Sequence, residues 1–187
     1  MRMPLFRSAG FSLLELVVTL AIIGILSGLA THSWGTWVNQ SRQRAILEHY
    51  HSLFAFARWS AASLRKTVTV CPLSATGQCV DDWQRPVSIF VDEDKDRRPD
   101  NGEILSQSGI ELAPFSLNSR TGGRGYFRFN DEGMSSGAMG SLVLCPTNTS
   151  EGTMSYMPVN MAGRFRVEKD NDRDGRIRLS WGGLISC

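Results

Sequence analysis

Glu15 is the one acid in a long apolar segment, and its carboxylate is the first group along the chain whose chemistry stands out. No Asp, Glu, Lys or Arg other than Glu15 occurs from residue 8 to residue 41. On insertion scales, an acid at the centre of a membrane helix costs roughly 2.5–3.5 kcal/mol. Such an acid is retained where it reaches the membrane surface or finds a cationic partner. We therefore interpret Glu15 as an ion-pairing residue rather than an accidental acid near the membrane surface.

The segment around Glu15 has the length of a membrane-spanning helix. Residues 11–33 are predicted to form a transmembrane helix, because about 20 consecutive apolar residues cross a bilayer. Arg2 and Arg7 precede this segment. The positive-inside rule therefore predicts that the leader, residues 1–10, stays in the cytoplasm.

The residues that surround Glu15 resemble a known processing signal. Arg2 and Arg7, the run Gly10-Phe11-Ser12-Leu13-Leu14 and then Glu15 resemble the prepilin signature of type IV pilins and type II secretion pseudopilins. The resemblance implies that a prepilin peptidase cuts between Gly10 and Phe11 and methylates the new amino group of Phe11. In an ordinary secretory signal the apolar core precedes the cleavage site and is removed. Here the apolar segment follows the proposed cut and is retained.

The resemblance also gives Glu15 a role in filament assembly. In the family this acid pairs with the amino terminus of a neighbouring subunit, and Phe11 would carry that cationic amine here. In a low-dielectric environment the attraction is strong, although desolvation offsets most of it. Pairing of Glu15 with the amine of its own chain is the alternative, and the sequence leaves it open.

Length and composition allow one membrane helix and one globular domain. The chain has 187 residues and a formal net charge of +2, so overall charge does not indicate a nucleic-acid or acidic partner. The helix is predicted to continue beyond the membrane through residues 34–64, where apolar residues recur near helical spacing. This part of the helix is predicted to bury Leu53, Phe56 and Trp59.

From residue 65 onward the apolar pattern changes to a period of two, which is typical of strands. Residues 65–187 are therefore predicted to form a β-rich head domain, and the fold class to be α+β, with an antiparallel sheet packed on the second half of the helix. The alternating runs include Val68/Val70, Val87/Ile89/Val91, Phe127/Phe129, Leu142/Leu144, Met157/Val159, Phe165/Val167 and Ile177/Leu179/Trp181.

All four cysteines lie in this head domain, at positions 71, 79, 145 and 187. With the leader in the cytoplasm, the head lies in the periplasm, where disulfides persist. Four cysteines allow three pairings, and we favour Cys71–Cys79 and Cys145–Cys187. Zinc is disfavoured because the sequence contains no C-x-x-C pair and no histidine after Cys71.

Landmarks along the head domain resemble the GspH/FimT group, which contains H-type minor pseudopilins and related minor pilins. The resemblance implies a type IV pilin-like fold and the role of a minor, initiating or near-tip subunit. The landmarks are Leu53-Phe54-Ala55-Phe56-Ala57-Arg58, Thr67-Val68-Thr69-Val70-Cys71-Pro72, the acidic loop after Phe90-Val91, Phe129-Asn130-Asp131-Glu132-Gly133, Leu144-Cys145-Pro146 and Gly163-Arg164-Phe165-Arg166.

A calcium-type spacing occurs near the C-terminus. Asp170, Asp172 and Asp174, followed by Gly175, reproduce the first half of an EF-hand loop. The bidentate acid at position twelve is missing, because Trp181 stands there. The alternative is a solvated acidic turn. We therefore predict no required cofactor, with Asp170, Asp172 and Asp174 as a candidate calcium site.

Asp92, Asp94 and Asp96 repeat the same spacing earlier in the chain, but Arg97 occupies the position of the turn glycine. Calcium is less favoured at this loop for that reason.

Arginines near the C-terminus raise the alternative of DNA binding. Some FimT-type minor pilins bind DNA through a Gly-Arg-x-Arg-x-Arg tail, and Gly163, Arg164 and Arg166 match its beginning. Glu168 replaces the third arginine, while Arg176 and Arg178 supply a second Arg-x-Arg. Phosphate binding needs uncompensated cations. The acids at 151, 168, 170, 172 and 174 therefore favour local ion pairing over DNA binding.

Three further arginines belong to the same candidate surface. Arg120, Arg124 and Arg128 are predicted to extend it if DNA is the ligand.

No pattern indicates an enzyme. The sequence contains no Gly-rich phosphate loop, no G-x-S-x-G and no metal triad, and all three histidines fall in the predicted helix. The predicted function is that of a minor pseudopilin or minor pilin. Its implied partners are other pilins or pseudopilins in a helical filament, the prepilin peptidase and the inner-membrane assembly platform. The implied location is the inner membrane, with a single pass, a cytoplasmic N-terminus and a periplasmic head.

Overall fold

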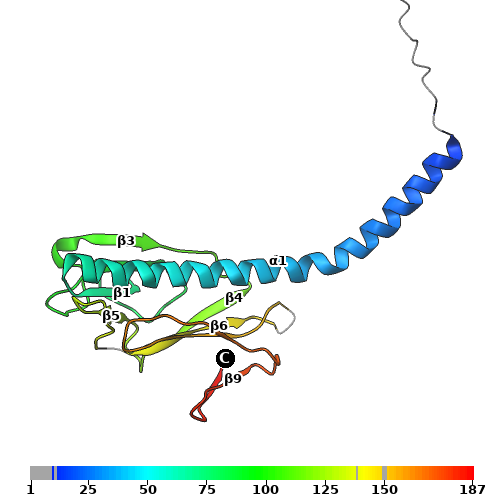
Figure 1. The fold of residues 1–187 in the computed structure, drawn as a ribbon. Coiled ribbons are helices and arrows are strands. Elements are labelled where there is room, and N and C mark those ends of the chain that lie inside the picture. Colours follow the sequence, from blue (N-terminus) through cyan, green and yellow to red (C-terminus); the bar gives the residue numbers. More distant parts are fainter. Residues whose placement is uncertain (1–9, 11, 138, 149–150) are drawn as a thin grey trace, which may run out of the picture. The chain divides into compact units, whose positions relative to one another are not determined.

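The computed structural model describes residues 10, 12–137, 139–148 and 151–187. The chain divides into two compact units, Met1–Val38 and Asn39–Cys187, which are treated separately below. The long helix α1, Leu13–Leu64, begins in the first unit and ends in the second (Figure 1). The predicted leader falls almost entirely outside the described residues, as does Phe11.

A cap defines the start of α1. The backbone N–H of Glu15 donates to the Ser12 hydroxyl at 3.2 Å, and the N–H of Leu16 donates to the Ser12 carbonyl at 3.2 Å. Ser12-x-x-Glu15 is the sequence signature of a capping box, a signal that sequence reasoning missed. Glu15 therefore lies in the first helical turn, where the helix dipole favours an acid.

Within the described residues, no helix combines the length and the apolar character that crossing a bilayer requires. The transmembrane assignment of residues 11–33 thus stays a prediction.

The end of α1 agrees with the prediction. Arg65 has a φ of 52°, and the N–H of Lys66 donates to the Ala61 carbonyl at 3.2 Å. A residue in the left-handed region followed by this bond is a standard helix stop, so α1 ends at Leu64.

The buried face of α1 differs from the predicted one. Leu53 is buried as expected, but Phe56 is 38% exposed and Trp59 is 65% exposed. The buried stripe repeats at intervals of three and four residues and includes Ile46, Tyr50, Leu53, Phe54, Ala57 and Ala61. The prediction was wrong because it selected the largest apolar residues rather than the stripe, which contains two alanines.

The described residues of the head form two antiparallel four-stranded sheets. The first has the order β3-β2-β1-β5 and the second the order β4-β6-β7-β8. The strands are β1 Val68–Pro72, β2 Val87–Val91, β3 Ile104–Ser108, β4 Phe115–Arg120, β5 Phe127–Phe129, β6 Gly140–Pro146, β7 Ser155–Val159 and β8 Glu168–Lys169. A separate hairpin pairs β9, Arg176–Arg178, with β10, Leu184–Ser186.

The α+β fold class is confirmed, while several strands differ from those predicted. β3, β4 and β10 were not predicted. In β3 and β10 the apolar residues are adjacent rather than alternating, and the single alternating pair of β4, Phe115 and Leu117, was missed. The predicted strand at Phe165/Val167 is reduced to a single bridge between Val159 and Phe165.

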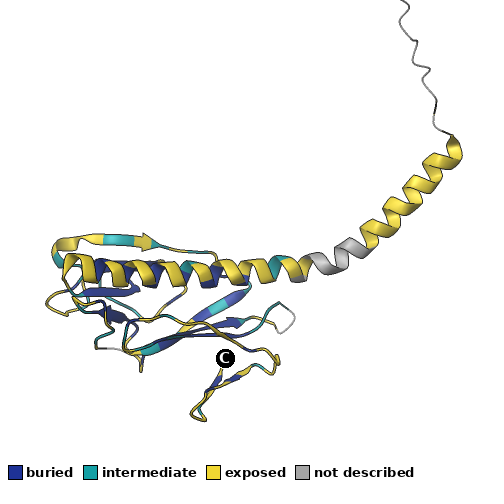
Figure 2. Ribbon diagram, in the orientation of Figure 1, coloured by how far each residue is buried: buried dark blue, intermediate teal, exposed yellow. Residues whose placement is uncertain are grey.

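One main core joins α1 to both sheets (Figure 2). The ring of Phe54 on α1 lies 5.0 Å from that of Phe127 and 4.8 Å from that of Phe165. Val70, Ile89 and Phe129 enter this core from the first sheet, and Leu117, Leu142, Leu144 and Met157 from the second.

The C-terminal hairpin packs on the other face of the second sheet. Leu142 and Leu144 belong to the main core, whereas Val143 and Cys145 belong to a second cluster with Ile177 and Ile185. This division follows from the alternation of side chains along β6.

The structure contains both of the favoured disulfides. Cys71–Cys79 closes a local loop with a Cα–Cα distance of 5.5 Å. Cys145–Cys187 ties the last residue to β6 with a Cα–Cα distance of 5.7 Å.

Tyr50 makes the head sensitive to alkaline pH. Its side chain is 2% exposed, and burial raises the pKa of Tyr50 from 10.0 to about 12. A group whose pKa is higher in the folded state stabilises the fold below its unfolded pKa and loses that contribution as pH rises through the folded value. We therefore expect a loss of roughly 2–3 kcal/mol of unfolding free energy between pH 10 and 12.

Urea unfolding of the chain at pH 8, 10 and 11.5 measures this loss, and Tyr50→Phe is the matched control. The control should show a smaller alkaline loss than the wild type. Equal losses would contradict the assignment to Tyr50.

Candidate functional site

The first candidate site is the start of α1. Gly10 and Glu15 are exposed, whereas Phe11, the proposed methylated residue, lies outside the described residues. The large apolar side chains described between Leu13 and Leu26 are all exposed in the single chain, from 48% at Val18 to 81% at Leu13. Exposed apolar surface of this extent is typical of sites that contact other proteins or a membrane.

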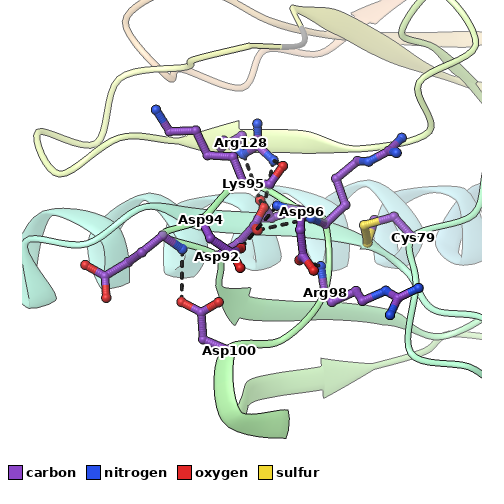
Figure 3. Close-up of polar contacts among 12 residues, drawn as sticks. Cys79, Asp92, Asp94, Lys95, Asp96, Arg98, Asp100 and Arg128 are labelled. Atoms are coloured by element: carbon purple, nitrogen blue, oxygen red, sulfur yellow. Dashed lines mark hydrogen bonds and ion pairs between the residues drawn. A yellow bond between two sulfur atoms is a disulfide. The ribbon is translucent and has the colours of Figure 1, made fainter.

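The second candidate site is the acidic loop after β2 (Figure 3). Asp92 is fully buried, and its Oδ2 accepts hydrogen bonds from the Arg128 guanidinium at 2.7 Å and from the Thr69 hydroxyl at 2.6 Å. Its Oδ1 accepts from the Arg97 N–H at 3.1 Å. Both carboxylate oxygens are thus occupied within the protein.

The neighbouring acids of this loop hold its backbone. Asp94 accepts from the N–H of Asp96, Asp96 accepts from the N–H of Arg98, and Asp100 accepts from the N–H of Glu93. These are turn-stabilising contacts that short acidic side chains make without a metal.

Arg128 is misplaced in the sequence-based prediction. It was expected on an exposed DNA-binding surface, but it is 6% exposed. Its guanidinium also lies 4.8 Å from the centre of the Tyr126 ring and donates to the Lys95 carbonyl at 3.2 Å. No signal in the sequence indicated this burial, because alternation along a strand places Arg128 on the face opposite Phe127 and Phe129, and that face is also buried in β5.

The third candidate site is the loop between β8 and β9. One carboxylate oxygen from each of Asp170, Asp172 and Asp174 lies within 4.8 Å of the other two. Asp170 is 4% exposed, and its Oδ2 accepts from the N–H of Gly175 at 2.9 Å. A side-chain contact with Asp170 is the largest cause of a pKa of Asp172 below its usual value.

The candidate DNA-binding arginines are all exposed, at positions 164, 166, 176 and 178. Arg176 and Arg178 flank the buried Ile177 on β9 and so share one face. Arg178 lies 4.0 Å from Asp174, and a surface hollow lined by both arginines also contains Glu168, Asp170 and Asp172. Acids therefore accompany these cations.

Of the three further arginines, Arg120 and Arg124 have backbone partners. Arg120 donates to the carbonyl of Ser186 at 3.0 Å, and Arg124 donates to the carbonyl of Gly137 at 2.9 Å. The first contact joins the end of β4 to β10, and the second joins two residues that lie outside the strands.

Two landmarks that lie far apart in the sequence meet in the structure. Gly163 has a φ of 69°, and a Cβ there would fall 2.3 Å from the Gly133 carbonyl oxygen. The two turns are joined by a hydrogen bond from the N–H of Ser135 to the carbonyl of Met161 at 3.0 Å. Gly163 thus allows close approach of two backbones rather than serving an arginine motif.

Gly163→Ala is expected to destabilise the head by at least about 2 kcal/mol, since it adds a backbone clash to the cost of a left-handed residue. Gly182→Ala is the matched control: Gly182 has a φ of 88°, and a Cβ there would meet no neighbouring atom within 4 Å, so only the backbone cost applies. Chemical unfolding of both variants measures the difference. A Gly163→Ala variant no less stable than Gly182→Ala would contradict the clash.

Comparison with known proteins decides the family. Residues 47–183 match the family model described as "Type II transport protein GspH", which covers more than half of the chain. The chain belongs to the GspH family. Residues 5–31 match the "Prokaryotic N-terminal methylation motif", so this member carries the processing signal of membrane-anchored pilins.

Solved structures support the pilin fold. Two crystal forms of the type IV minor pilin FimU of Pseudomonas aeruginosa PAO1 are similar to this chain, with TM-scores of 0.54 and 0.53. Sequence identities are 17% and 16%, and the alignments cover 72% and 68% of this chain and 97% of each FimU chain. No curated protein matches the sequence significantly.

Family and fold together identify a type IV pilin-like minor pilin or pseudopilin, a structural subunit rather than an enzyme. Membership in this class implies assembly with other pilins and processing by a prepilin peptidase.

Proposed function

We propose that this GspH-family member is an H-type minor pseudopilin or minor pilin that joins a type II secretion pseudopilus or a type IV pilus through α1. The supporting observation is the division of α1 into a buried face and exposed apolar surfaces. In the head unit one face packs on both sheets, while Phe56 and Trp59 remain exposed on the other with ring centres 5.9 Å apart. Large exposed aromatic side chains are typical of protein interfaces.

The proposed topology follows from the same elements. The prepilin peptidase removes residues 1–10, residues 11–33 anchor the chain in the inner membrane, and the head lies in the periplasm. Two disulfides in the head suit an oxidising compartment. The partners are other pilins or pseudopilins and the inner-membrane assembly platform, with this subunit in an initiating or near-tip position.

Site-specific photocrosslinking tests the interface. A photoreactive phenylalanine analogue replaces Trp59 or, as the matched control, Trp181 of the C-terminal hairpin, which is 72% exposed. Illumination of cells that express the secretion or pilus system should link position 59 to other pilin-like subunits more than position 181. Equal or weaker labelling at position 59 would contradict assembly through this face of α1.

Two further tests address cleavage of the leader and the choice between a secretion system and a pilus. The mass of the membrane-extracted protein should show loss of the leader and addition of one methyl group at Phe11. An intact leader in a host with active peptidase would overturn the assignment. Deletion of the gene should reduce either export of secreted proteins or surface piliation. The process that is reduced identifies the assembly, secretion pseudopilus or pilus, that contains this subunit.

DNA capture is the second candidate, favoured only by the exposure of Arg164, Arg166, Arg176 and Arg178. The adjacent acids argue against it, because DNA binding depends on uncompensated cations. A gel shift at low and at physiological salt tests it. Binding that persists at physiological salt and disappears when all four arginines become alanine would favour DNA capture over a purely structural role.

A further inference from the structure

We propose that the loop between β8 and β9 is a calcium site, with the carboxylates of Asp170, Asp172 and Asp174 as its ligands. The three acids alone would not justify this assignment, since exposed acidic clusters are common without a metal. The decisive feature is that Asp170, the first of the three acids, is buried while one of its carboxylate oxygens has no hydrogen-bond partner among the described residues.

Asp170 has an unsatisfied carboxylate oxygen although it is almost completely buried. The residue is 4% exposed, and its Oδ1 makes no hydrogen bond to any described part of the chain. A buried charged oxygen without a partner is costly. The other oxygen, Oδ2, accepts from Gly175 within the loop at 2.9 Å, and one oxygen of the carboxylate lies within 4.8 Å of an oxygen of each of the two acids that follow.

The loop backbone suits a cation held by acids at alternate positions. Gly175 has a φ of 75°, and its N–H bond to Asp170 closes the turn. The Asp174 carboxylate accepts from the N–H of Arg176 at 2.8 Å. A glycine at position six and acids at positions one, three and five are the ligand spacing of calcium loops.

The acidic loop after β2 is an internal comparison. Its buried acid, Asp92, has both oxygens occupied by Arg128, Thr69 and Arg97. One carboxylate oxygen from each of Asp92, Asp94 and Asp100 also lies within 4.8 Å of the other two, but the buried acid of this group is already paired with the Arg128 guanidinium. In the loop between β8 and β9 the ion pair found among described residues joins Asp174 and Arg178 at 4.0 Å, with Arg178 80% exposed, and Asp170 takes no part in it.

The chemistry favours calcium over magnesium and predicts weak affinity. Carboxylate oxygens on an exposed, irregular loop tolerate the variable geometry of calcium, whereas magnesium requires a near-ideal octahedron. Trp181 occupies the position at which an EF-hand loop has a bidentate acid, and the absence of that ligand lowers the affinity for calcium. We expect a dissociation constant of about 10⁻⁴–10⁻³ M, in the range of extracellular modules.

Calcium bound in this loop would stabilise the attachment of the C-terminal hairpin to the second sheet. The N–H of Asp170 donates to the Met154 carbonyl at 3.0 Å, next to the second sheet, and β9 begins at Arg176. Asp170 and Gly175 also line a small cavity with Thr153 and Cys187. A cation here would therefore hold the loop that connects the sheet to the disulfide-linked hairpin.

Calcium titration of the full-length chain in a non-ionic detergent tests the proposal. Calorimetry with CaCl₂ should show one site, with MgCl₂ at least ten-fold weaker. The variant Asp172→Asn/Asp174→Asn changes only exposed side chains and should weaken calcium binding at least ten-fold. Asp94→Asn/Asp96→Asn, in the loop after β2, is the matched control and should bind as the wild type does.

Thermal unfolding gives an independent readout. Millimolar CaCl₂ should raise the midpoint of the wild type and of the control variant but not that of Asp172→Asn/Asp174→Asn. Absence of saturable binding up to 10 times the expected upper dissociation constant of about 10⁻³ M would overturn the proposal. Equal weakening by both double variants would also overturn it.

Discussion

Replacement of Arg128 by methionine is expected to lower the unfolding free energy of the head by about 3–5 kcal/mol, because it leaves a buried carboxylate without its counter-charge. Asp92 is fully buried and Arg128 is 6% exposed, with 2.7 Å between the paired atoms. Thr69 and the N–H of Arg97 would still bind the carboxylate, but neither carries a charge. Urea unfolding at neutral pH measures the effect.

Two controls separate loss of charge pairing from loss of packing. Lys66 and Glu93 form an ion pair at 3.0 Å in the same part of the head, with side chains 47% and 53% exposed. Lys66→Met should therefore cost only about 0–1 kcal/mol. The double variant Asp92→Asn/Arg128→Met removes both charges and should be more stable than Arg128→Met alone. If the double variant is no more stable, burial of an unpaired charge is not the cause.

Glu15→Gln is expected to reduce incorporation of the subunit into filaments at least about ten-fold, which corresponds to roughly 1.4 kcal/mol of lost pairing. This prediction rests on the proposed function. The expected partner is the new amino terminus of a neighbouring subunit, and coupling between close charges at interfaces is commonly larger than this amount. Quantitative immunoblots of sheared or affinity-purified filaments measure incorporation relative to the amount in the membrane.

Ser12→Ala is the matched control for the start of the helix. It removes the hydroxyl that accepts the N–H of Glu15 at 3.2 Å but keeps the carboxylate. Loss of such a cap costs about 1 kcal/mol of helix stability. Ser12→Ala should therefore assemble nearly as well as the wild type. If Glu15→Gln assembled as well as Ser12→Ala, the carboxylate would not be needed for incorporation.

Local patterns along the chain were enough to predict several features. The end of α1 at Leu64, the strands around Val70, Ile89 and Leu144, and the favoured disulfide pairs agree with the structure. The helix end and the strands depend on side-chain periodicity and on turn residues close in sequence, whereas Cys145–Cys187 joins residues 42 positions apart and was favoured because it restrains the end of the chain. The family resemblance, too, rests on short contiguous motifs, and the GspH match confirms it.

Other features depend on which distant segments meet. Phe54 is buried and Phe56 is exposed, although both are apolar residues on the same helix. The difference arises because Phe127 and Phe165, from strands and loops far along the chain, pack against Phe54. Helical periodicity indicates that one face is buried, but the partners determine which face.

The two acidic loops also could not be distinguished from the sequence alone. Their Asp-x-Asp-x-Asp spacing is identical, so sequence by itself determined only that two clusters of carboxylates exist. The tertiary structure supplied Arg128 to Asp92 from β5, while Asp170 is buried with one oxygen unpartnered among the described residues. Because the hydrogen-bond partners of a buried acid are supplied by its three-dimensional neighbours, only the fold could show that Asp92 is already ion-paired while Asp170 keeps an oxygen without a partner.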